Sequence, residues 1–530
     1  MHSTAVSIAR SVRSGEQTAT EVVIDALERI AAANSAVNAF VEVRAAEALQ
    51  ESRTLDARIR SGEDPGPLAG VPVAVKDSLW ERGKEATAGS RSLLGFRPPA
   101  TSEAVKRLTA AGAIVVGRTN LPEFCYRGDC SNDLYGVTSN PADSSRTAGG
   151  SSGGSAAAVG AGMVPLALGS DGGGSIRIPA SFCGTVGFKP TFGRVPRMPG
   201  FHGWYTLNHV GPLTSTVADA ALAYDVLHGP DGRDAATLPR TEPSDKSGSS
   251  QAVSQLKIAY SEDLGYVKVD DEVRRAFRRA VDKFAEWGAS VVEASPPLAN
   301  PLEVWNTLSF VDNLASEEHL LNTGLVGDDS RVLIEAGRAF TGADYARARN
   351  EQNEIAAAWD AFMSDFDLLL TPTMECVSFP HGTTAPRNIG GHEVVGFDDD
   401  WCHFSYPFDL SGQPAISVPL PSIETSLPMG LQIVGRRFDD ELVLDVATEW
   451  EKRVDWSPSE LNTHEPPIPP ELLKSLGDAI AADGSEVAFQ ATESPIVAGQ
   501  RIELDGATVH VRRSYSSAPG AHVVEFEQLQ

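Results

Sequence analysis

Residues Gly149–Pro179 read GGSSGGSAAAVGAGMVPLALGSDGGGSIRIP, two glycine turns joined by an apolar segment. The turns are centred on Ser151 and Ser175. Glycine allows backbone conformations with positive φ and close approach of other groups. Successive backbone N–H groups in such a turn can point at one anion. A serine there has its hydroxyl beside donors able to hold an oxyanion, so each turn could carry a nucleophile that attacks a carbonyl. The apolar segment between them argues against a flexible Gly/Ser linker.

Short apolar strands and helices alternate on both sides of this stretch. Val71–Val75 predicts a buried strand that delivers Lys76 at its end, and another strand is expected from Ile114, after a helix over residues 102–111. Thr18 and Glu21 have the spacing of a capping box. The alternation favours an α/β fold with a large mixed β-sheet core flanked by helices.

The composition changes near the C-terminus. We expect a main domain over residues 1–456 and an extension over 457–530. The extension begins with a proline-rich linker, EPPIPP at Glu465–Pro470, and a short helix over residues 470–482. A β-hairpin is predicted around Asp505-Gly506, between two alternating runs. The extension therefore reads as a small α+β appendage.

Charge and composition exclude several classes of protein. The 530 residues include 44 Lys and Arg against 71 Asp and Glu, a net charge of −27, which would repel nucleic acid and anionic membranes. The apolar runs are too short to span a bilayer and the N-terminus lacks the apolar core of a signal peptide, so we expect a cytoplasmic protein. The five cysteines form no CxxC pair, so no disulfide framework, metal site or cofactor is expected.

A serine nucleophile needs a base, and the residues leave two kinds open. Lys76 could serve if it were neutral, but about one lysine in 10³ or fewer is neutral at pH 7. Burial would have to lower its pKa by about 3 units, roughly 4 kcal/mol. The nearest histidines downstream are His202 and His209. Lys76 could also be a surface residue paired with Asp77.

Taken together, the motifs resemble the amidase signature family, whose hydrolases use a serine–serine–lysine triad. The resemblance covers roughly residues 1–455 in consistent order. It is carried by LAGVPVAVKD around Lys76, GRTNLPEF from Gly117, the long segment from Asn140 through both glycine turns, GPLTSTVADAAL from Gly211, LLLTPT from Leu368, YPFDLSGQPAISVP from Tyr406 and LPMGLQIVG from Leu427. It implies the amidase signature fold and a catalytic domain over residues 1–456.

The resemblance also implies a role for each residue of the site. Ser175 would form the acyl-enzyme, Lys76 would be the base, and Ser151, which follows a cis peptide bond in the family, would pass protons between them. The backbone N–H groups of Gly172, Gly173, Gly174 and Ser175 would form the oxyanion hole. Ser152, Asp171 and Arg177 would give supporting hydrogen bonds. Where this chain has Asp409, the hydrolases usually carry Asn.

The expected function is hydrolysis of a small carboxamide, which could be an aliphatic or aryl amide, an anilide or a carbamate, with esters as side substrates. Aromatic segments predict an apolar acyl pocket, with candidates Tyr126, Trp204, Tyr205, Trp401 and Phe404. The alternative is the glutamine-hydrolysing component of a tRNA-dependent amidotransferase. That component usually has threonine and glutamine where this chain has Gly172 and Ile178.

Other interpretations have less support. Residues 150–154 fit a G-x-S-x-G nucleophile elbow with Ser152 as nucleophile, but that interpretation leaves the second glycine turn unexplained. A catalytically idle binding protein would not need Lys76, Ser151 and Ser175 together. The expected partner is a small-molecule amide substrate, with no nucleic acid and no membrane, and a homodimer is left open.

Overall fold

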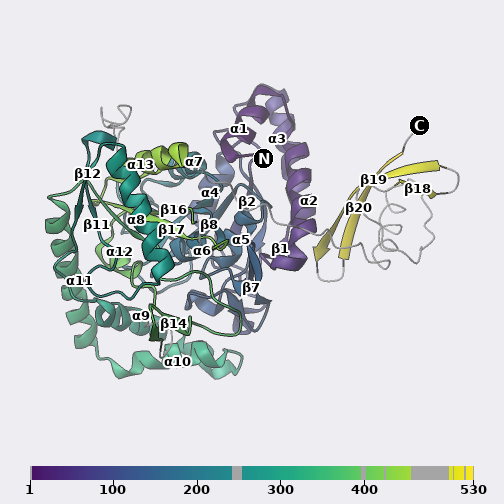
Figure 1. Ribbon diagram of the computed structural model, residues 1–530. Coiled ribbons are helices and arrows are strands. Elements are labelled where there is room, and N and C mark those ends of the chain that lie inside the picture. Colours follow the sequence, from purple (N-terminus) through teal and green to yellow (C-terminus); the bar gives the residue numbers. More distant parts are fainter. Residues whose placement is uncertain are drawn as a thin grey trace.

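The computed structural model describes residues 3–240, 253–394, 401–422 and 425–454, and three strands near the C-terminus. An 11-stranded sheet runs through the main body with helices on its faces (Figure 1). The strands lie in the order β1 (Phe40–Val43), β3 (Ile114–Thr119), β2 (Pro72–Lys76), β8 (Leu166–Asp171), β10 (His209–Thr214), β9 (Val186–Lys189), β16 (Ala415–Pro419), β17 (Gly430–Gly435), β13 (Leu368–Pro372), β11 (Lys257–Tyr260) and β12 (Ser290–Glu293).

The sheet mixes parallel and antiparallel neighbours, as predicted. β2 is parallel to β3 and β8, whereas β10 is antiparallel to both β8 and β9. At the far end, β11 is parallel to β13 and β12. Every residue of β2, β3 and β8 is buried, because helices cover both faces. These strands therefore read in the sequence as nearly continuous apolar runs.

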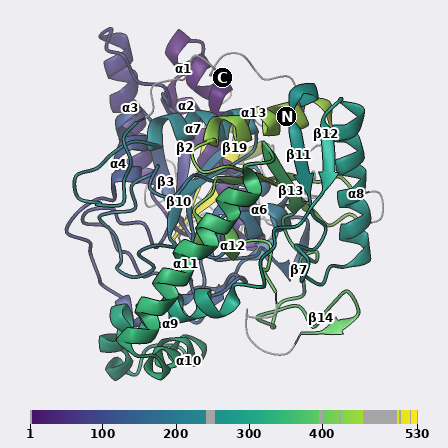
Figure 2. The same cartoon turned by 90° about the vertical axis from the view of Figure 1, so that its left-hand side faces the viewer.

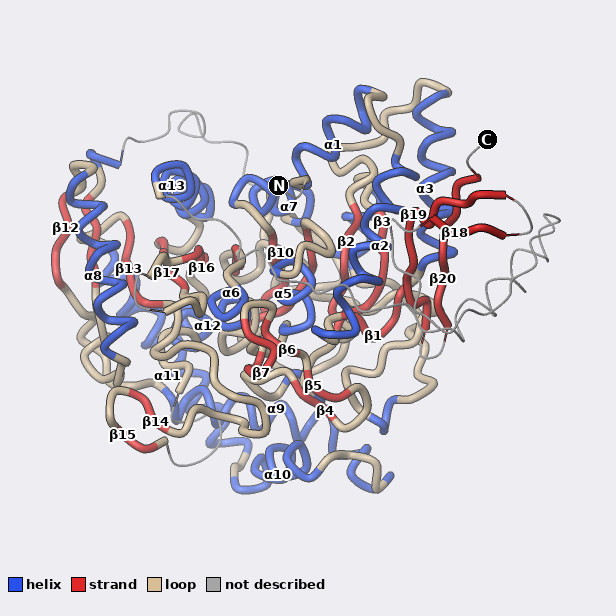
Figure 3. Tube along the Cα trace, turned by 45° about the vertical axis from the view of Figure 1, so that its right-hand side comes forward, coloured by secondary structure: helices blue, strands red, loops and turns tan. Residues whose placement is uncertain are grey.

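Helices cover the two faces of the sheet. Figure 3 shows α7 (Val217–Leu227) and α13 (Asp440–Arg453) on one side of the central strands and α6 (Arg177–Cys183), α11 (Gly342–Met363) and α12 (Tyr406–Ser411) on the other. Figure 2 shows α9 (Leu302–Glu317) and α10 (Asp328–Ala336) at one end of α11. The remaining α-helices of the described ranges are α1 (Ala5–Ser14), α2 (Ala19–Val37), α3 (Ala45–Arg60), α4 (Glu103–Ala110), α5 (Gly153–Gly160) and α8 (Asp271–Glu286).

Two short helices begin at the glycine turns and lie inside the molecule. All seven residues of α6 are buried, as are those of α5 from Gly153 to Val159. A side chain on Gly154 would place its Cβ 2.4 Å from the Asn120 backbone nitrogen, so only glycine permits this approach. The alanines and glycines after Ser151 thus serve close helix–sheet packing.

Local sequence signals were reliable in the N-terminal half. The Thr18–Glu21 capping box is present at the start of α2, with the Thr18 side chain accepting from the Glu21 N–H. The strand predicted before Lys76 is β2, the strand from Ile114 is β3, and the helix before it is α4.

The C-terminal extension is described only in part. β18 (Arg501–Leu504), β19 (Ala507–Ala518) and β20 (Ala521–Gln528) form an antiparallel sheet, and Leu504 pairs with Ala507. These strands flank the predicted hairpin turn, but Asp505-Gly506 itself lies outside the described residues, as do the predicted linker and the helix over 470–482. The domain boundary at residue 456 remains a prediction.

Candidate active site

Lys76 ends β2 inside the molecule. Its Nζ lies 2.7 Å from Ser151 Oγ and 3.0 Å from Ser170 Oγ, and the side chain has no exposed surface. The neighbouring Asp77 points elsewhere and pairs with Arg118 at 2.6 Å. The alternative of a surface ion pair between Lys76 and Asp77 is therefore wrong.

Burial controls the charge of this lysine. It lowers the Lys76 pKa, while Cys125, Cys130 and Asp171 oppose the shift weakly. Among the described residues Lys76 forms no ion pair with a carboxylate. The amino group is thus placed where its neutral form is favoured and where it can accept a proton from the Ser151 hydroxyl.

The turn carrying Ser151 is fixed by its backbone. Gly149 has φ 77°, and the Gly150–Ser151 peptide bond is cis. The N–H of the next residue, Ser152, donates to the Ser175 carbonyl at 3.1 Å. This bond ties the two glycine turns together, so Ser151 and Ser175, 24 positions apart in the chain, meet at one place.

Ser152 itself has a structural part in this arrangement. Its Oγ donates to the Ser170 carbonyl at 3.1 Å and accepts from the Ser170 N–H at 3.2 Å, and its side chain is fully buried. A hydroxyl that both donates to and accepts from the end of β8 is not available as a nucleophile. The geometry thus disfavours the nucleophile elbow.

The second turn, Gly172–Ser175, is enclosed by side chains. A Cβ on Gly172 would meet Trp204 at 2.4 Å, and one on Gly173 would meet Trp305 at 2.7 Å. Gly174 has φ 121°, and a Cβ there would lie 2.4 Å from Ser405 Oγ. Two contacts fix the peptide planes: Trp305 Nε1 donates to the Gly172 carbonyl at 2.9 Å, and Ser405 Oγ donates to the Gly173 carbonyl at 2.6 Å.

The amide groups of this turn differ in availability. The Gly174 N–H donates to Asp171 Oδ1 at 2.6 Å. No partner of the Gly172, Gly173 or Ser175 N–H occurs in the part of the chain that the structure describes. The prediction that Gly174 donates to an oxyanion is therefore not supported, because its N–H already holds Asp171.

A buried charge network anchors the turn from behind. Arg177 donates to both oxygens of Asp171, at 2.9 and 3.0 Å, and to Asp409 at 2.8 Å. Burial by itself would raise the pKa of Asp171, but the charge and hydrogen bonds of Arg177 outweigh it and hold that pKa below the ordinary value. Burial, together with the charge of Asp171, raises the pKa of Asp409 well above the ordinary value. Asp171 and Arg177 thus order the loop, as predicted for supporting residues.

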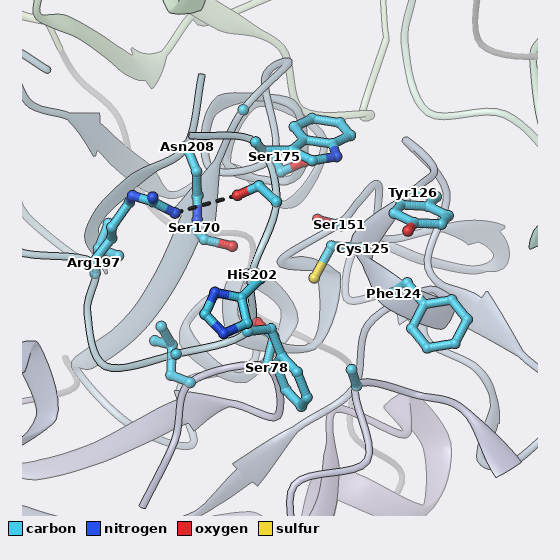
Figure 4. Close-up of a pocket in the computed structure, with 18 of the residues that line it drawn as sticks. Ser78, Phe124, Cys125, Tyr126, Ser151, Ser170, Ser175, Arg197, His202 and Asn208 are labelled. Carbon is cyan, nitrogen blue, oxygen red and sulfur yellow. Dashed lines mark hydrogen bonds between the residues drawn. The ribbon is translucent and has the colours of Figure 1, made fainter. Parts of the chain in front are cut away.

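A cavity of about 100 Å³ opens in front of the serines. Ser151, Ser170 and Ser175 line it, and Figure 4 shows Tyr126 and Arg197 on opposite sides of it. Its wall is completed by Ser78, Leu79, Ala88, Phe124, Cys125, Gly172, Gly200, Phe201, His202, Gly203, Trp204, Asn208, Val210 and Glu317. The mixture is an aromatic and apolar wall with a few polar groups, typical of small-molecule sites.

The aromatic predictions are correct only in part. Tyr126 and Trp204 line the cavity, and their rings are stacked at a centroid distance of 6.5 Å. Tyr205 is 53% exposed and covers the Arg197 guanidinium from outside. Trp401 and Phe404 are fully buried, Trp401 against Phe182. The prediction that these last three line the pocket is wrong: the two buried rings pack in the core, which apolar pattern alone does not separate from a pocket wall.

The histidines do not replace the lysine. His202 lines the cavity but bonds neither Ser151 nor Ser175. His209 is buried, with Nδ1 2.6 Å from the Leu207 carbonyl and Nε2 3.4 Å from Lys189 Nζ. Burial and the Lys189 charge lower its pKa well below the ordinary value. Lys76 is therefore the basic group that contacts a serine of the site.

Sequence reasoning missed several residues. Ser170 contacts Lys76, Trp305 and Ser405 hold the glycine turn, and Glu317 lines the cavity. Ser170 ends a strand beside the second turn, so its position in GSDGGGS was a usable signal. The other three come from distant segments that carry no local pattern.

The comparisons with known proteins agree with this geometry. The sequence model of the Amidase family matches residues 21–444. The chain is 37% identical to an acylamidase of Rhodococcus erythropolis, over 86% of this chain and 96% of that protein. It is 35% identical to a glutamyl-tRNA(Gln) amidotransferase subunit of Chloroflexus aggregans, over 86% and 97%. A solved bacterial aryl acylamidase of the amidase signature family superposes with a TM-score of 0.81 at 33% identity, covering 88% of this chain and 99% of that one.

Proposed function

The chain belongs to the amidase signature family, and from this premise we propose that Ser175, Ser151 and Lys76 hydrolyse a small carboxamide through an acyl-enzyme. The chain is an amidohydrolase that acts on C–N amide bonds, in keeping with its acylamidase and aryl acylamidase relatives. The assignment of the individual steps to residues is our proposal. No helix in the described ranges is long and apolar enough to cross a bilayer.

The first half of the reaction acylates Ser175. Neutral Lys76 accepts the Ser151 proton, and Ser151 accepts the proton of Ser175, whose Oγ forms a bond to the amide carbon. The carbonyl electron pair moves onto oxygen, where the N–H groups of Gly172, Gly173 and Ser175 stabilise the charge. The C–N bond then breaks as Ser151 passes a proton to the leaving nitrogen and is reprotonated by Lys76.

The second half releases the acid. Water attacks the acyl carbon and gives up a proton through Ser151 to Lys76, which is neutral again at this stage. The C–O bond to Ser175 breaks and the Ser175 hydroxyl regains a proton by the same route. One relay of Ser151 and Lys76 thus serves both halves of the reaction.

One observation carries the proposal: the 2.7 Å contact between the Lys76 amino group and Ser151 at the wall of a cavity that Ser175 also lines. A fully buried lysine without a carboxylate partner is costly, because burial disfavours the charged form. A proton relay gives this placement a use that a structural role does not.

The substrate is bounded by the cavity. Its volume of about 100 Å³ admits a small group, and Tyr126, Phe124 and Trp204 favour an apolar or aromatic one. We therefore place aliphatic and aryl amides and anilides first, with carbamates and esters as further candidates.

The alternative, a glutamine-hydrolysing component of an amidotransferase, is favoured by the similarity to the Chloroflexus aggregans protein. Against it, Trp204 occupies the space that a threonine at position 172 would need. The discriminating experiment measures hydrolysis by the isolated chain. We expect turnover of acetanilide and small aliphatic amides, with glutamine at least 100-fold slower. Turnover of glutamine alone would favour the amidotransferase function.

A further inference from the structure

One wall of the cavity carries an acidic group that the hydrolytic mechanism does not use. Glu317 lines the cavity as the last residue of α9. Its Oε2 accepts a hydrogen bond of 2.5 Å from the Tyr126 hydroxyl. Among the described residues, Oε1 has no hydrogen-bond partner and Glu317 forms no ion pair. A half-buried carboxyl is therefore fixed in place by one oxygen and left without a partner at the other.

The surroundings of Glu317 suit a cation. The Tyr126 ring lies between Phe124, at a centroid distance of 5.6 Å, and Trp204, at 6.5 Å. Aromatic faces attract ammonium groups. The C-terminal end of a helix, where Glu317 lies, carries a partial negative charge that also favours cations. The net charge of −27 adds a long-range field of the same sign.

The charged and titratable groups around the cavity are few. Asp312 of the same helix adds negative charge near Glu317. Cys125 belongs to the same wall segment as Tyr126, and Arg197 and His202 come from the loop across the cavity. Arg197 donates to the Gly203 carbonyl at 3.2 Å and packs on Tyr205, on the side opposite Tyr126 (Figure 4).

We propose that Glu317, held by Tyr126, is a specificity residue that binds a positively charged ammonium group of the substrate. The preferred substrates are then amides that carry a basic amine a few bonds from the scissile carbonyl. This inference rests on the proposed function and narrows its substrate class. Glu317 takes no part in the bond-breaking steps.

The proposal has a consequence for pH dependence. Burial raises the pKa of Glu317 to about 8, so the carboxyl is largely neutral at pH 7 when the cavity is empty. A bound ammonium favours the ionised form, so binding releases a proton. The preference for a cationic substrate should therefore grow as the pH rises through about 8, while the amine, with a pKa near 10, remains charged.

The experiment compares matched p-nitroanilides. A series of ω-aminoalkanoyl p-nitroanilides is measured beside alkanoyl p-nitroanilides that carry CH₃ in place of NH₃⁺. The quantity is the ratio of the two kcat/KM values, because Lys76 ionisation affects both substrates and cancels. For at least one chain length we expect a ratio above 10 at pH 8.5 that falls several-fold at pH 6.5.

The variants locate the effect. Glu317→Gln keeps the size of the side chain and should lower the ratio at least tenfold and remove its pH dependence. Glu318→Gln is the matched control, since the adjacent carboxylate is 53% exposed and pairs with Arg338. It should leave the ratio unchanged. Should Glu317→Gln unfold, as judged by circular dichroism, Glu317→Asp must retain a ratio above 1 with the same direction of pH dependence.

The outcomes separate this inference from the proposed function. Failure to hydrolyse either substrate contradicts the proposed function. Hydrolysis of both with a ratio near 1, or a ratio that Glu317→Gln does not change, overturns the role of Glu317 alone. A preference for ω-carboxyalkanoyl substrates would point to Arg197 and would also overturn it.

Discussion

Lys76 Nζ and Ser151 Oγ lie 2.7 Å apart inside the protein, and no carboxylate of the described chain pairs with the amino group. A charged lysine at this place would be poorly stabilised, so the contact favours a neutral amine that accepts a proton. The chemistry of the site therefore depends on this contact and on the elements that hold it.

Replacing the base should stop the reaction. Lys76→Ala should lower kcat/KM for a small anilide at least 10³-fold, the upper part of the range for general bases. Lys76→Arg should not restore it, because a guanidinium stays protonated. In the wild type, kcat/KM should rise with pH and level off below the ordinary lysine pKa of about 10.4, since burial lowers the Lys76 pKa. Activity of Lys76→Arg within tenfold of the wild type would rule out this role.

The second glycine turn should not tolerate a side chain. Gly174→Ala places a Cβ 2.4 Å from Ser405 Oγ on a backbone with φ 121°. The turn must shift, so the amide donors move and kcat should fall at least 100-fold. Gly232→Ala is the matched control, because nothing lies within 4 Å of its Cβ. Measuring kcat together with the melting temperature distinguishes a displaced turn from an unfolded protein.

Asp409 should behave as a neutral group. Burial raises its pKa, so the folded state holds a proton that the unfolded chain loses above about pH 4. Its contribution to stability therefore declines as the pH rises. Asp409→Asn keeps an acceptor for Arg177 and lacks this decline. The free energy of urea unfolding of the variant, relative to the wild type, should increase from pH 5 to pH 8. A relative decrease would mean that Asp409 is ionised and stabilised by Arg177.

The sequence predicted the parts of the site that depend on local pattern. Apolar runs placed β2 and β8, and the glycine turns placed Ser151 and Ser175 at the ends of buried elements. It could not decide between Lys76 and a histidine as the base until the resemblance to a family was used. The structure supports Lys76 through distance and burial, two properties that local pattern does not contain.

The rest of the cavity depends on contacts between distant segments. Glu317 and Tyr126 are 191 positions apart, and Trp305 reaches Gly172 across 133. An apolar pattern marks Trp401 and Trp204 equally, yet one packs in the core and the other lines the cavity. Which face of an aromatic segment meets the cavity is decided by helix packing, here by α9 lying over the second glycine turn.

The most direct measurement is mass spectrometry of the protein after reaction with an aryl sulfonyl fluoride or a phosphonate that labels activated serines. The mechanism predicts one label per chain, on the peptide that contains Ser175, absent in Ser175→Ala and strongly slowed in Lys76→Ala. Labelling of Ser152, or labelling of Ser175 at an unchanged rate in Lys76→Ala, would contradict the proposed relay from Ser175 through Ser151 to Lys76.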